Sequence, residues 1–421
     1  MDFNIESYLL EYGKKAKKAA FAMAQAGTEL KNKALATVAD ALIKNTEYII
    51  AENDKDIAEA VNNGIRPAMV DRLKLTAERI AGMAEGLVQL CALPDPVGET
   101  IEGFKRPNGL EILKKRVPIG VLGIIFESRP NVTADAAGLC IKSGNACILR
   151  GGKEAIHSNL AIASVFSKAL AEAGLPADAV QLIDKTDREI ATGLMRLNKY
   201  VDVLIPRGGA GLIRSVVENS TVPVIQTGTG NCHTYIDASA DFDMAKKIVI
   251  NAKTQRPSVC NAMETLLVHK DIAKDFLPAI CAALKEKAVE IRGCDETVGI
   301  CGDSVVKAEQ SDWETEYNDL ILALKVVDNI DQAIAHINEY GTGHSEAIVT
   351  SSFSAAEQFK REVDAACVYV NASTRFTDGF EFGFGAEIGI SNQKLHARGP
   401  MGLKELTTVK YVISGDGQCR G

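Results

Sequence analysis

The sequence contains no apolar run near the roughly 18 residues that a membrane-spanning helix needs. It opens with MDFNIESYLLEYGKK, which carries acids where a secretory signal carries basic residues. The 10 cysteines include no CxxC pair and no repeated spacing, which argues against a disulfide framework and against a zinc site. The net charge of −8 argues against a broad nucleic-acid surface. We therefore expect a cytoplasmic protein with reduced thiols and with no metal, membrane or nucleic-acid partner.

The 421 residues are too many for one ordinary hydrophobic core and predict two or three domains. Neither an internal repeat nor a low-complexity linker interrupts the chain. Residues 29–63 form a long helical pattern that ends at Asn63-Gly64, and residues 76–91 form another. The lysines of residues 14–18 lie in an alanine-rich helical pattern and are interpreted as a solvated helix face.

A β-ribbon is predicted after these helices. The stretch FKRPNGLEILKKRVP places two short alternating runs about Asn108-Gly109, which is a strong hairpin signal. Near the end of the chain, TTVKYVISG alternates like an edge strand. We expect this tail strand to be able to pair with another subunit.

Two series of alternating strand and helix patterns make up the rest of the chain. The first contains the strands VPIGVLGIIF, ACILR, AVQLI, YVDVLI and VPVI, with helices at 133–143, 157–173, 187–197 and 210–218. The second contains HTYID, TLLVH, LILALKVV, EAIVT and CVYVN, with helices at 241–252, 271–289, 329–338 and 353–364. Such alternation predicts an α/β fold with parallel sheets and right-handed crossovers. Sheets of this kind bind ligands at the carboxyl ends of their strands.

Two glycine loops of the first series are candidate phosphate sites. IPRGGAGLIRSV runs from a strand through Gly208, Gly209 and Gly211 into a helix, whose amino end offers unpaired N–H groups. ILRGGKEAIHSN has the same order, with Arg150 and Lys153 beside its glycines. Each loop alone is also compatible with a plain turn, and the cations with ordinary surface residues. Two such loops in one sheet favour a dinucleotide, and the two cations favour its phosphorylated form.

Cys260 in TQRPSVCNAMET is the candidate nucleophile. A cysteine that forms no disulfide is most often a buried packing residue. Cys260, however, lies at the start of the second series, where the first domain would present a nicotinamide. Arg256 is a nearby cation that could activate the thiol. We therefore interpret Cys260 as a nucleophile.

Several stretches together resemble a known family. The most specific is AIAHINEYGTGHSEAI, which includes His336, His344, Ser345 and Glu346. Supporting stretches are FESRPNVTADAAGLCIKSGNACILRGGKE, QTGTGNCHTYID and GFGAEIGISNQKLHARGPMGLKELTTVKY. On these stretches, which cover nearly the whole chain, the sequence resembles the aldehyde dehydrogenase superfamily and, within it, the acyl-phosphate reductases of proline biosynthesis. The resemblance implies two Rossmann-like parallel-sheet domains with a β-ribbon oligomerisation arm.

The resemblance also implies roles for individual residues. Cys260 falls at the position of the catalytic cysteine, and Glu316 at that of the glutamate that holds the nicotinamide ribose. Arg150 takes the place of a cofactor-binding lysine. Lys153 stands where NAD-using members keep a ribose-binding glutamate, so repulsion of a 2′-phosphate is exchanged for attraction. This exchange agrees with the NADPH preference that the resemblance implies.

Two departures from the family pattern bear on the chemistry. Members that oxidise aldehydes keep a glutamate as the general base for water, but here IQTGTGN has Gln226 or Thr227 in that place. A thioester at Cys260 would therefore be poorly hydrolysed. The oxyanion asparagine is also replaced, because the turn reads FESRPN, with Ser128 in the corresponding place and Asn131 just beyond. The backbone N–H of Cys260 remains a further oxyanion donor.

The substrate is expected to carry an amine, a carboxylate and a phosphate, so its pocket needs charges of both signs. Arg129 and Arg256 are the candidate anion holders. His344 either orders a turn after the helix at 329–338 or acts directly. The residues expected at the far wall of the pocket are Ser373, Arg375, Glu381 and Ser391.

The resemblance implies reduction of gamma-glutamyl phosphate to glutamate-5-semialdehyde plus phosphate, through a thioester on Cys260 and with NADPH as reductant. Alternatives are an aldehyde dehydrogenase that forms an acid, and a catalytically silent dinucleotide-binding protein. A homo-oligomer, as a dimer or a multiple of it, and functional coupling to a glutamate 5-kinase are also implied. The expected domains are an NADP-binding domain (1–104 and 118–227), a catalytic domain (228–400) and an oligomerisation arm (105–117 and 401–421).

Overall fold

The structure is a computed structural model that describes residues 4–420. The chain forms two compact units, here called the first and the second unit. The first consists of Met1–Gln226, Gly383–Gly389 and Met401–Gly421, and the second of Thr227–Phe382 and Ile390–Pro400. The boundary at 226 lies one residue before the expected one, and residues 383–389 belong to the first unit rather than to the second. Within residues 4–420, no helix is both long and apolar enough to cross a bilayer.

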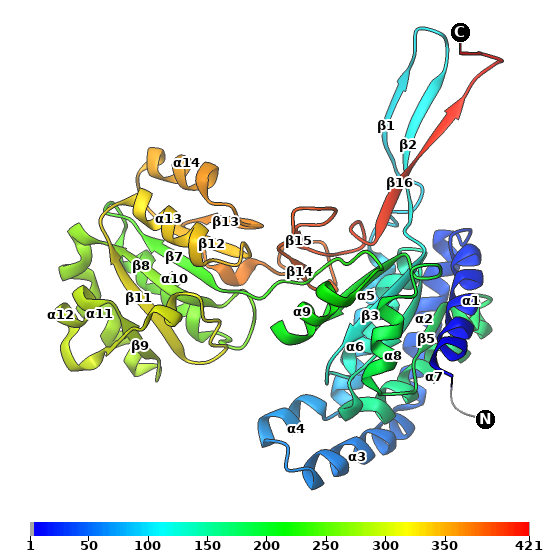
Figure 1. Ribbon diagram of the computed structural model, residues 1–421, viewed down its shortest axis with the longest axis horizontal. Helices are drawn as coiled ribbons and strands as arrows, with labels where there is room; N and C mark the ends of the chain where they lie inside the picture. Colours follow the sequence, from blue (N-terminus) through cyan, green and yellow to red (C-terminus); the bar gives the residue numbers. More distant parts are fainter. Residues whose placement is uncertain (1–3, 421) are drawn as a thin grey trace. The chain divides into compact units, whose positions relative to one another are not determined.

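The first unit begins with helices that pack against one another and against the first sheet (Figure 1). They are α1 (Ile5–Met23), α2 (Thr28–Lys44), α3 (Thr46–Asn62), α4 (Pro67–Leu73) and α5 (Ala77–Ala92). The prediction of one continuous helical stretch over 29–63 is wrong, because the chain breaks at Asn45. The Asn45 side chain donates to the Ala41 carbonyl at 2.7 Å. This bond is the local competition with the helical backbone that disfavours asparagine inside helices.

The first sheet is parallel, with the order β5-β4-β3-β6. Its strands are β3 (Val121–Phe126), β4 (Ala146–Arg150), β5 (Val180–Leu182) and β6 (Val203–Arg207). The helices between and after them are α6 (Asn131–Lys142), α7 (Ile156–Ala173), α8 (Arg188–Met195) and α9 (Ala210–Asn219), with the short turns η1 (Lys153–Ala155) and η2 (Ala177–Ala179). The run VPVI is not the predicted strand: it forms a single bridge from Val224 to Leu204, and Pro223 has no N–H to extend the pairing.

The predicted hairpin and tail strand form one antiparallel ribbon in the first unit (Figure 1). Its strands are β1 (Thr100–Lys105), β2 (Glu111–Pro118) and β16 (Thr407–Ser414), in the order β1-β2-β16. Gly109 has φ +93° at the hairpin turn, a conformation that glycine adopts readily. The ribbon begins at Thr100, five residues before the expected arm. Phe104, Tyr411 and Ile413 are large apolar side chains exposed on it.

The second unit contains a parallel sheet in the order β10-β9-β11-β8-β7-β12-β13. Its strands are β7 (Cys232–Ile236), β8 (Met263–His269), β9 (Glu290–Gly293), β10 (Val306–Lys307), β11 (Ile321–Val327), β12 (Ser345–Val349) and β13 (Cys367–Val370). The helices are α10 (Phe242–Thr254), α11 (Lys270–Glu286), α12 (Asp295–Cys301), α13 (Ile330–Tyr340) and α14 (Phe353–Glu362). Shorter elements are η3 (Gly302–Ser304), η4 (Gln310–Trp313), η5 (Thr374–Phe376), β14 (Ile390–Ser391) and β15 (Gly399–Pro400).

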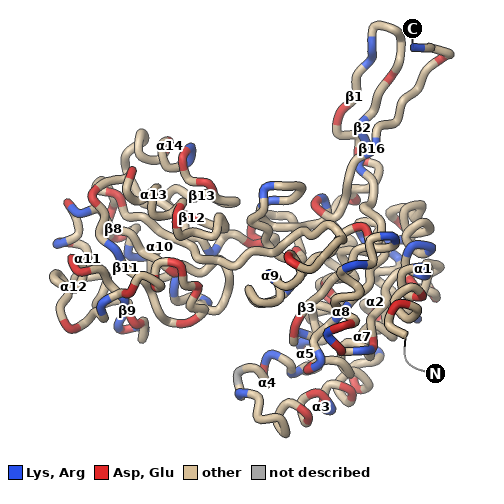
Figure 2. The backbone as a smooth tube through the Cα atoms, viewed as in Figure 1, with Lys and Arg blue, Asp and Glu red and all other residues tan. Residues whose placement is uncertain are grey.

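Separate hydrophobic clusters of the second unit involve different helices. One joins β8 to α10 and α11 through side chains such as Leu266 and Phe276, and the other joins β7 to α13 and α14 through Tyr235 and Phe359. The predicted α/β fold with parallel sheets is therefore confirmed. Acidic and basic residues are interspersed over both units (Figure 2).

Candidate active site

The candidate catalytic cysteine lies at the amino edge of the second sheet. Cys260 precedes β8, Gly230 precedes β7, and His344 precedes β12. Since β7, β8 and β12 are parallel neighbours, the loops before them meet at one edge. The general expectation of a ligand at the carboxyl ends of the strands therefore does not describe this sheet.

The backbone of Cys260 is held by the loop and strand that begin at Gly230. A Cβ atom added to Gly230 would lie 1.4 Å from the Cys260 carbonyl oxygen, so only glycine permits this approach. Cys232 Sγ donates to the same oxygen at 3.2 Å. The Cys260 side chain is partly exposed, as a nucleophile must be. Neither Gly230 nor Cys232 stands out in the sequence as part of a site.

The residue after the cysteine fastens the loop to η5. Asn261 Nδ2 donates to the Thr377 carbonyl at 2.9 Å, and Thr374 Oγ1 donates to the Asn261 carbonyl at 2.7 Å. Ser373 is buried and caps η5 by accepting the backbone N–H of Arg375. The structure thus brings the predicted Ser373 and Arg375 next to the cysteine loop.

Two cations lie close to the cysteine. Arg375 Nε donates to Gln255 Oε1 at 2.7 Å, which places its guanidinium beside the loop. Burial lowers the pKa of Arg375 and the nearby charge of Arg256 lowers it further, whereas a thiolate at Cys260 acts in the opposite direction. The attraction between thiolate and guanidinium is mutual, so Arg375 favours the reactive form of the thiol.

The candidate ribose-binding carboxylate is connected to the same loop. Gly230 N–H donates to Glu316 Oε1 at 2.8 Å. Ser391 is buried in β14, and the strand is tied to the loop before β7 because Gly228 N–H donates to the Ile390 carbonyl at 2.9 Å. Glu381 is exposed, and its backbone N–H donates to Asp378 Oδ1 at 3.4 Å.

His344 is fully buried beneath the cysteine loop, which argues against direct contact with a substrate. Its Nδ1 lies 2.8 Å from Ser345 Oγ and 3.8 Å from Cys232 Sγ. Ser345 Oγ continues the chain to Thr377 Oγ1 at 2.7 Å. His344 therefore helps to hold the residues around the cysteine loop in place, through Cys232 and, by way of Ser345, through Thr377.

Replacing His344 by asparagine is expected to change how stability depends on pH. Burial lowers the pKa of His344 from 6.5 to about 4. Below pH 6.5 the unfolded state therefore binds a proton that the folded state does not bind. The stability linked to neutral His344 is present above pH 6.5 and is lost as the pH falls toward 4. The difference in unfolding free energy between wild type and His344→Asn should therefore shrink by about 2 kcal/mol from about pH 7 to about pH 5.

Urea unfolding at these two pH values measures that difference. The control is His157→Asn, since His157 is partly exposed and its Nε2 lies 3.7 Å from Glu59 Oε1. A difference for His344→Asn that stays constant with pH would show that His344 is not held neutral by burial.

The rest of the signature stretch forms buried core near this edge. Glu346 Oε2 accepts the His233 backbone N–H at 2.7 Å, and burial raises the pKa of Glu346. The His233 ring packs edge-on against the His336 ring at 5.6 Å. The stretch AIAHINEYGTGHSEAI, which has the most specific resemblance, therefore forms buried core that supports the site.

In the first unit, the predicted cofactor loops meet at the carboxyl edge of the sheet. Ile125 pairs with Arg150 and Phe126 with Arg207, so β3, β4 and β6 end together. Arg150 Nη2 donates to the Thr186 carbonyl at 2.6 Å, while its Nε is buried without a hydrogen-bond partner. Lys153 is exposed in η1. An unsatisfied guanidinium nitrogen next to an exposed ammonium fits an anionic ligand such as a nucleotide phosphate.

The second glycine loop already holds an anionic side chain. Gly209 N–H, at the amino end of α9, donates to Glu127 Oε2 at 3.0 Å. A Cβ atom at Gly208 would lie 2.6 Å from the Glu127 carboxyl carbon, whereas one at Gly211 would meet no atom within 4 Å. The amino end of α9 thus binds a carboxylate of the chain itself, and a phosphate there would have to displace Glu127.

The candidate oxyanion donors lie in the turn before α6 and at the first residue of that helix. Asn131 Nδ2 donates to Asp135 Oδ2 at 2.9 Å, so this amide is engaged within its own helix. Burial raises the pKa of Asp135 to about 6. Ser128 and Arg129 are partly exposed in the turn before α6. Thr227 is buried.

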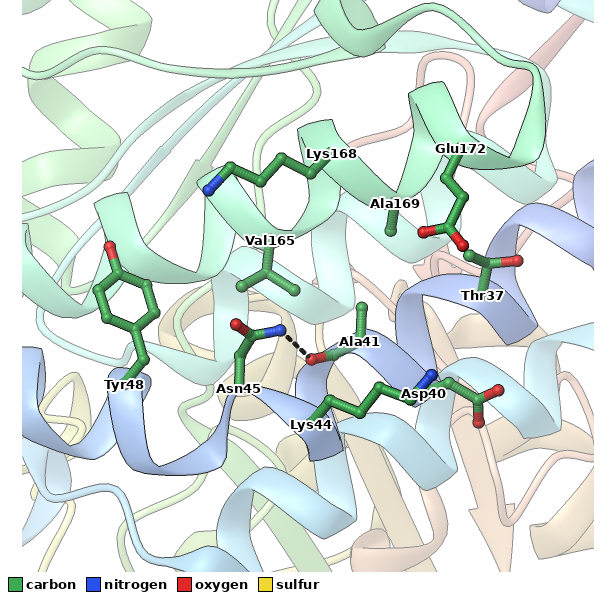
Figure 3. A pocket seen from close by; sticks show the side chains of 10 residues that line it. All are labelled: Thr37, Asp40, Ala41, Lys44, Asn45, Tyr48, Val165, Lys168, Ala169 and Glu172. Carbon is green, nitrogen blue, oxygen red and sulfur yellow. Dashed lines mark hydrogen bonds between the residues drawn. The ribbon is translucent and has the colours of Figure 1, made fainter.

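A cavity of about 580 Å³ lies among α2, α3 and α7 of the first unit, away from all these residues (Figure 3). Charges of both signs line it, among them Asp40, Lys44, Lys168 and Glu172. None of the predicted site residues lines this cavity, so it does not identify the chemistry of the chain.

The chain is similar to known proteins over nearly its whole length. The model of the aldehyde dehydrogenase family matches residues 10–301 and 304–412. The gamma-glutamyl phosphate reductase of Carboxydothermus hydrogenoformans is 62% identical over 413 residues, which are 98% of this chain and 99% of that protein. The one from Caldanaerobacter subterraneus subsp. tengcongensis is 60% identical over 407 residues, 97% of this chain and 98% of that protein.

A crystal structure is similar over the same extent. The gamma-glutamyl phosphate reductase of Thermotoga maritima superimposes with a TM-score of 0.97 at 51% sequence identity, covering 98% of this chain and 100% of that one. The chain therefore belongs to the aldehyde dehydrogenase family, in the branch of the gamma-glutamyl phosphate reductases.

Proposed function

We propose that this protein reduces gamma-glutamyl phosphate to glutamate-5-semialdehyde and phosphate, with NADPH as reductant, in proline biosynthesis. The observation that carries the proposal is the identity of about 60% with gamma-glutamyl phosphate reductases over nearly the whole of both chains. The cysteine loop supports it, because the charge of a guanidinium group, that of Arg375, interacts with the partly exposed Cys260.

The residues of the second unit account for the acyl transfer. The Cys260 thiolate attacks the acyl carbonyl, and phosphate leaves to give a thioester. Arg256 and Arg375 favour the thiolate and hold the anionic groups of the substrate. The backbone N–H of Cys260, with Ser128 and Asn131 as further candidates, stabilises the oxyanion. After reduction, collapse of the thiohemiacetal releases the semialdehyde and restores the thiolate.

The candidate cofactor residues are those that the family resemblance assigns. Arg150 and Lys153 would hold the 2′-phosphate, and Glu316 would accept hydrogen bonds from the nicotinamide ribose. Gly208, Gly209 and Gly211 let the ligand approach the backbone closely once Glu127 moves aside. When bound, NADPH supplies the hydride for the thioester carbonyl.

Dependence on inorganic phosphate tests the reaction. With glutamate-5-semialdehyde and NADP, a reductase that runs in reverse needs phosphate to release the acyl group from Cys260. No acid occurs in residues 225–231, where aldehyde oxidisers keep their general base. Formation of NADPH, followed by absorbance, should therefore rise from near zero with added phosphate. Turnover at full rate without phosphate would favour the alternative, an aldehyde dehydrogenase that forms an acid.

Replacing Lys153 by alanine is expected to weaken the use of NADPH. Loss of one charge-assisted hydrogen bond to a 2′-phosphate costs about 1.5 to 3 kcal/mol, or roughly 10- to 100-fold in kcat/KM. The kcat/KM for NADH should stay unchanged, since NADH has no phosphate at that position. Lys168→Ala, which removes an exposed lysine from α7, is the matched control. An equal loss with both cofactors would place Lys153 away from the 2′-phosphate.

We further propose a homo-oligomer that uses the ribbon. The edge strand β16 and the exposed Phe104, Tyr411 and Ile413 offer backbone pairing and apolar area to a second copy. Functional coupling to a glutamate 5-kinase and a cytoplasmic location remain predictions. Coupling is plausible on chemical grounds, because an acyl phosphate is a reactive substrate that a kinase must supply.

A further inference from the structure

A buried ion pair joins the two ends of the cysteine loop. Lys253 in the last turn of α10 and Glu264 in β8 are both 0% exposed, and Lys253 Nζ donates to Glu264 Oε2. The residues between them, 254–263, contain Cys260. Burial raises the pKa of Glu264 to about 7 and lowers the pKa of Lys253. Because the cost of desolvation offsets most of the attraction in such a pair, net stability does not explain it.

The second oxygen of Glu264 reaches the segment that carries Glu316. Glu264 Oε1 accepts the Asn318 backbone N–H at 3.2 Å. Asn318 has φ +56°, a left-handed conformation, so the chain turns sharply two residues after Glu316. The ring of Tyr317, between them, lies 5.9 Å from Lys253 Nζ. Both members of the ion pair therefore contact the turn at 316–318.

Glu316 connects the turn at 316–318 to the cysteine loop. Its Oε1 accepts the Gly230 N–H at 2.8 Å, and the backbone of Gly230 lies directly against the Cys260 carbonyl. A continuous series of contacts thus surrounds the cysteine loop, all within the second unit. It runs through Lys253, Glu264, Asn318, Glu316 and Gly230.

We propose that Lys253 and Glu264 are positioning residues that fix the Glu316 carboxylate relative to the Cys260 thiol. The proposal rests on the proposed function, in which Glu316 accepts from the nicotinamide ribose and Cys260 carries the acyl group. The same two side chains close the cysteine loop and hold the ribose-binding segment. Lys253 and Glu264 therefore couple cofactor binding at Glu316 to the position of the thioester on Cys260. Neither side chain touches cofactor or substrate.

Two double variants separate this role from a merely structural one. Lys253→Met with Glu264→Gln keeps a side-chain oxygen that can accept the Asn318 N–H, whereas Lys253→Met with Glu264→Leu removes it. Both variants lack the buried charges, and replacement of a buried ion pair by uncharged side chains is often neutral for stability. The difference between them therefore isolates the hydrogen bond to Asn318.

The expected result is weaker NADPH binding by the Leu variant than by the Gln variant, by about 3- to 10-fold, as for the loss of one hydrogen bond. Fluorescence titration of NADPH measures it without turnover. The KM for NADPH should rise and kcat should fall in the Leu variant, while the KM for gamma-glutamyl phosphate stays the same in both. Thermal unfolding shows whether the two variants are equally folded.

Equal NADPH affinity and equal kcat in the two variants would overturn the proposal, as would a loss confined to the KM for gamma-glutamyl phosphate. If the double variants do not fold, Glu264→Asp takes their place, because a carboxylate one methylene shorter cannot contact both Lys253 and Asn318. Unchanged NADPH affinity in Glu264→Asp would also overturn the proposal. A wild-type protein that binds NADPH but does not reduce gamma-glutamyl phosphate would refute the proposed function instead, and the binding comparison would still stand.

Discussion

Replacing Cys260 by serine is expected to lower the rate of gamma-glutamyl phosphate reduction by roughly 10³-fold or more, while NADPH binding stays unchanged. A hydroxyl is a far weaker nucleophile than a thiolate unless a base removes its proton. Arg375, whose charge interacts with Cys260, is a cation that stabilises a thiolate but accepts no proton. Rates are measured by the absorbance of NADPH, and binding by its fluorescence.

Cys301→Ser is the control, because Cys301 is also partly exposed but lies at the end of α12. It should keep nearly full activity. Reaction of wild type with an acyl-phosphate analogue, followed by mass spectrometry, should place the acyl group on Cys260. A label on another residue, or a Cys260→Ser variant as active as wild type, would refute covalent catalysis by this thiol.

Replacing Gly230 by alanine is expected to remove both stability and activity. The added methyl carbon would lie 1.4 Å from the Cys260 carbonyl oxygen, so backbone rather than a flexible side chain must move. We expect a loss of about 3 kcal/mol or more in the free energy of unfolding. The same shift would disturb the hydrogen bond from Gly230 N–H to Glu316, so NADPH binding should weaken as well.

Gly299→Ala provides the comparison, because a Cβ atom there meets no atom within 4 Å and Gly299 lies inside α12. This variant should be as stable as wild type or slightly more stable, since alanine favours a helix. Thermal and urea unfolding of both variants, with activity measured on the soluble fraction, tests the pair. A Gly230→Ala protein with normal stability and activity would contradict the close approach of the two backbones.

The sequence by itself predicted the parts of the fold that depend on local pattern. Alternating apolar strands and amphipathic helices indicated parallel sheets, and Asn108-Gly109 between alternating runs indicated the ribbon. Both follow from residues that are neighbours along the chain. The position of Cys260 before an apolar strand likewise indicated a loop at a sheet edge.

Other features depended on contacts that no local pattern reports. Asn261 contacts Thr377, 116 residues later, and Gly230 donates to Glu316, 86 residues later. The ion pair of Lys253 with Glu264 likewise depends on the packing of α10 against β8. The sequence pattern also does not predict the break at Asn45, because the apolar periodicity continues across it.

The sequence thus determined which segments become strands, helices and reactive loops, because these depend on steric and hydrophobic preferences over a few residues. Only the tertiary structure decided that the cysteine, the glycine before β7 and the ribose-binding carboxylate meet at the amino edge of the second sheet. That meeting depends on strand order and register, in which β8, β7 and β12 lie side by side although β11 precedes β12 in the chain. Strand order is fixed by how the buried faces pack together, and it therefore belongs to the folded chain as a whole.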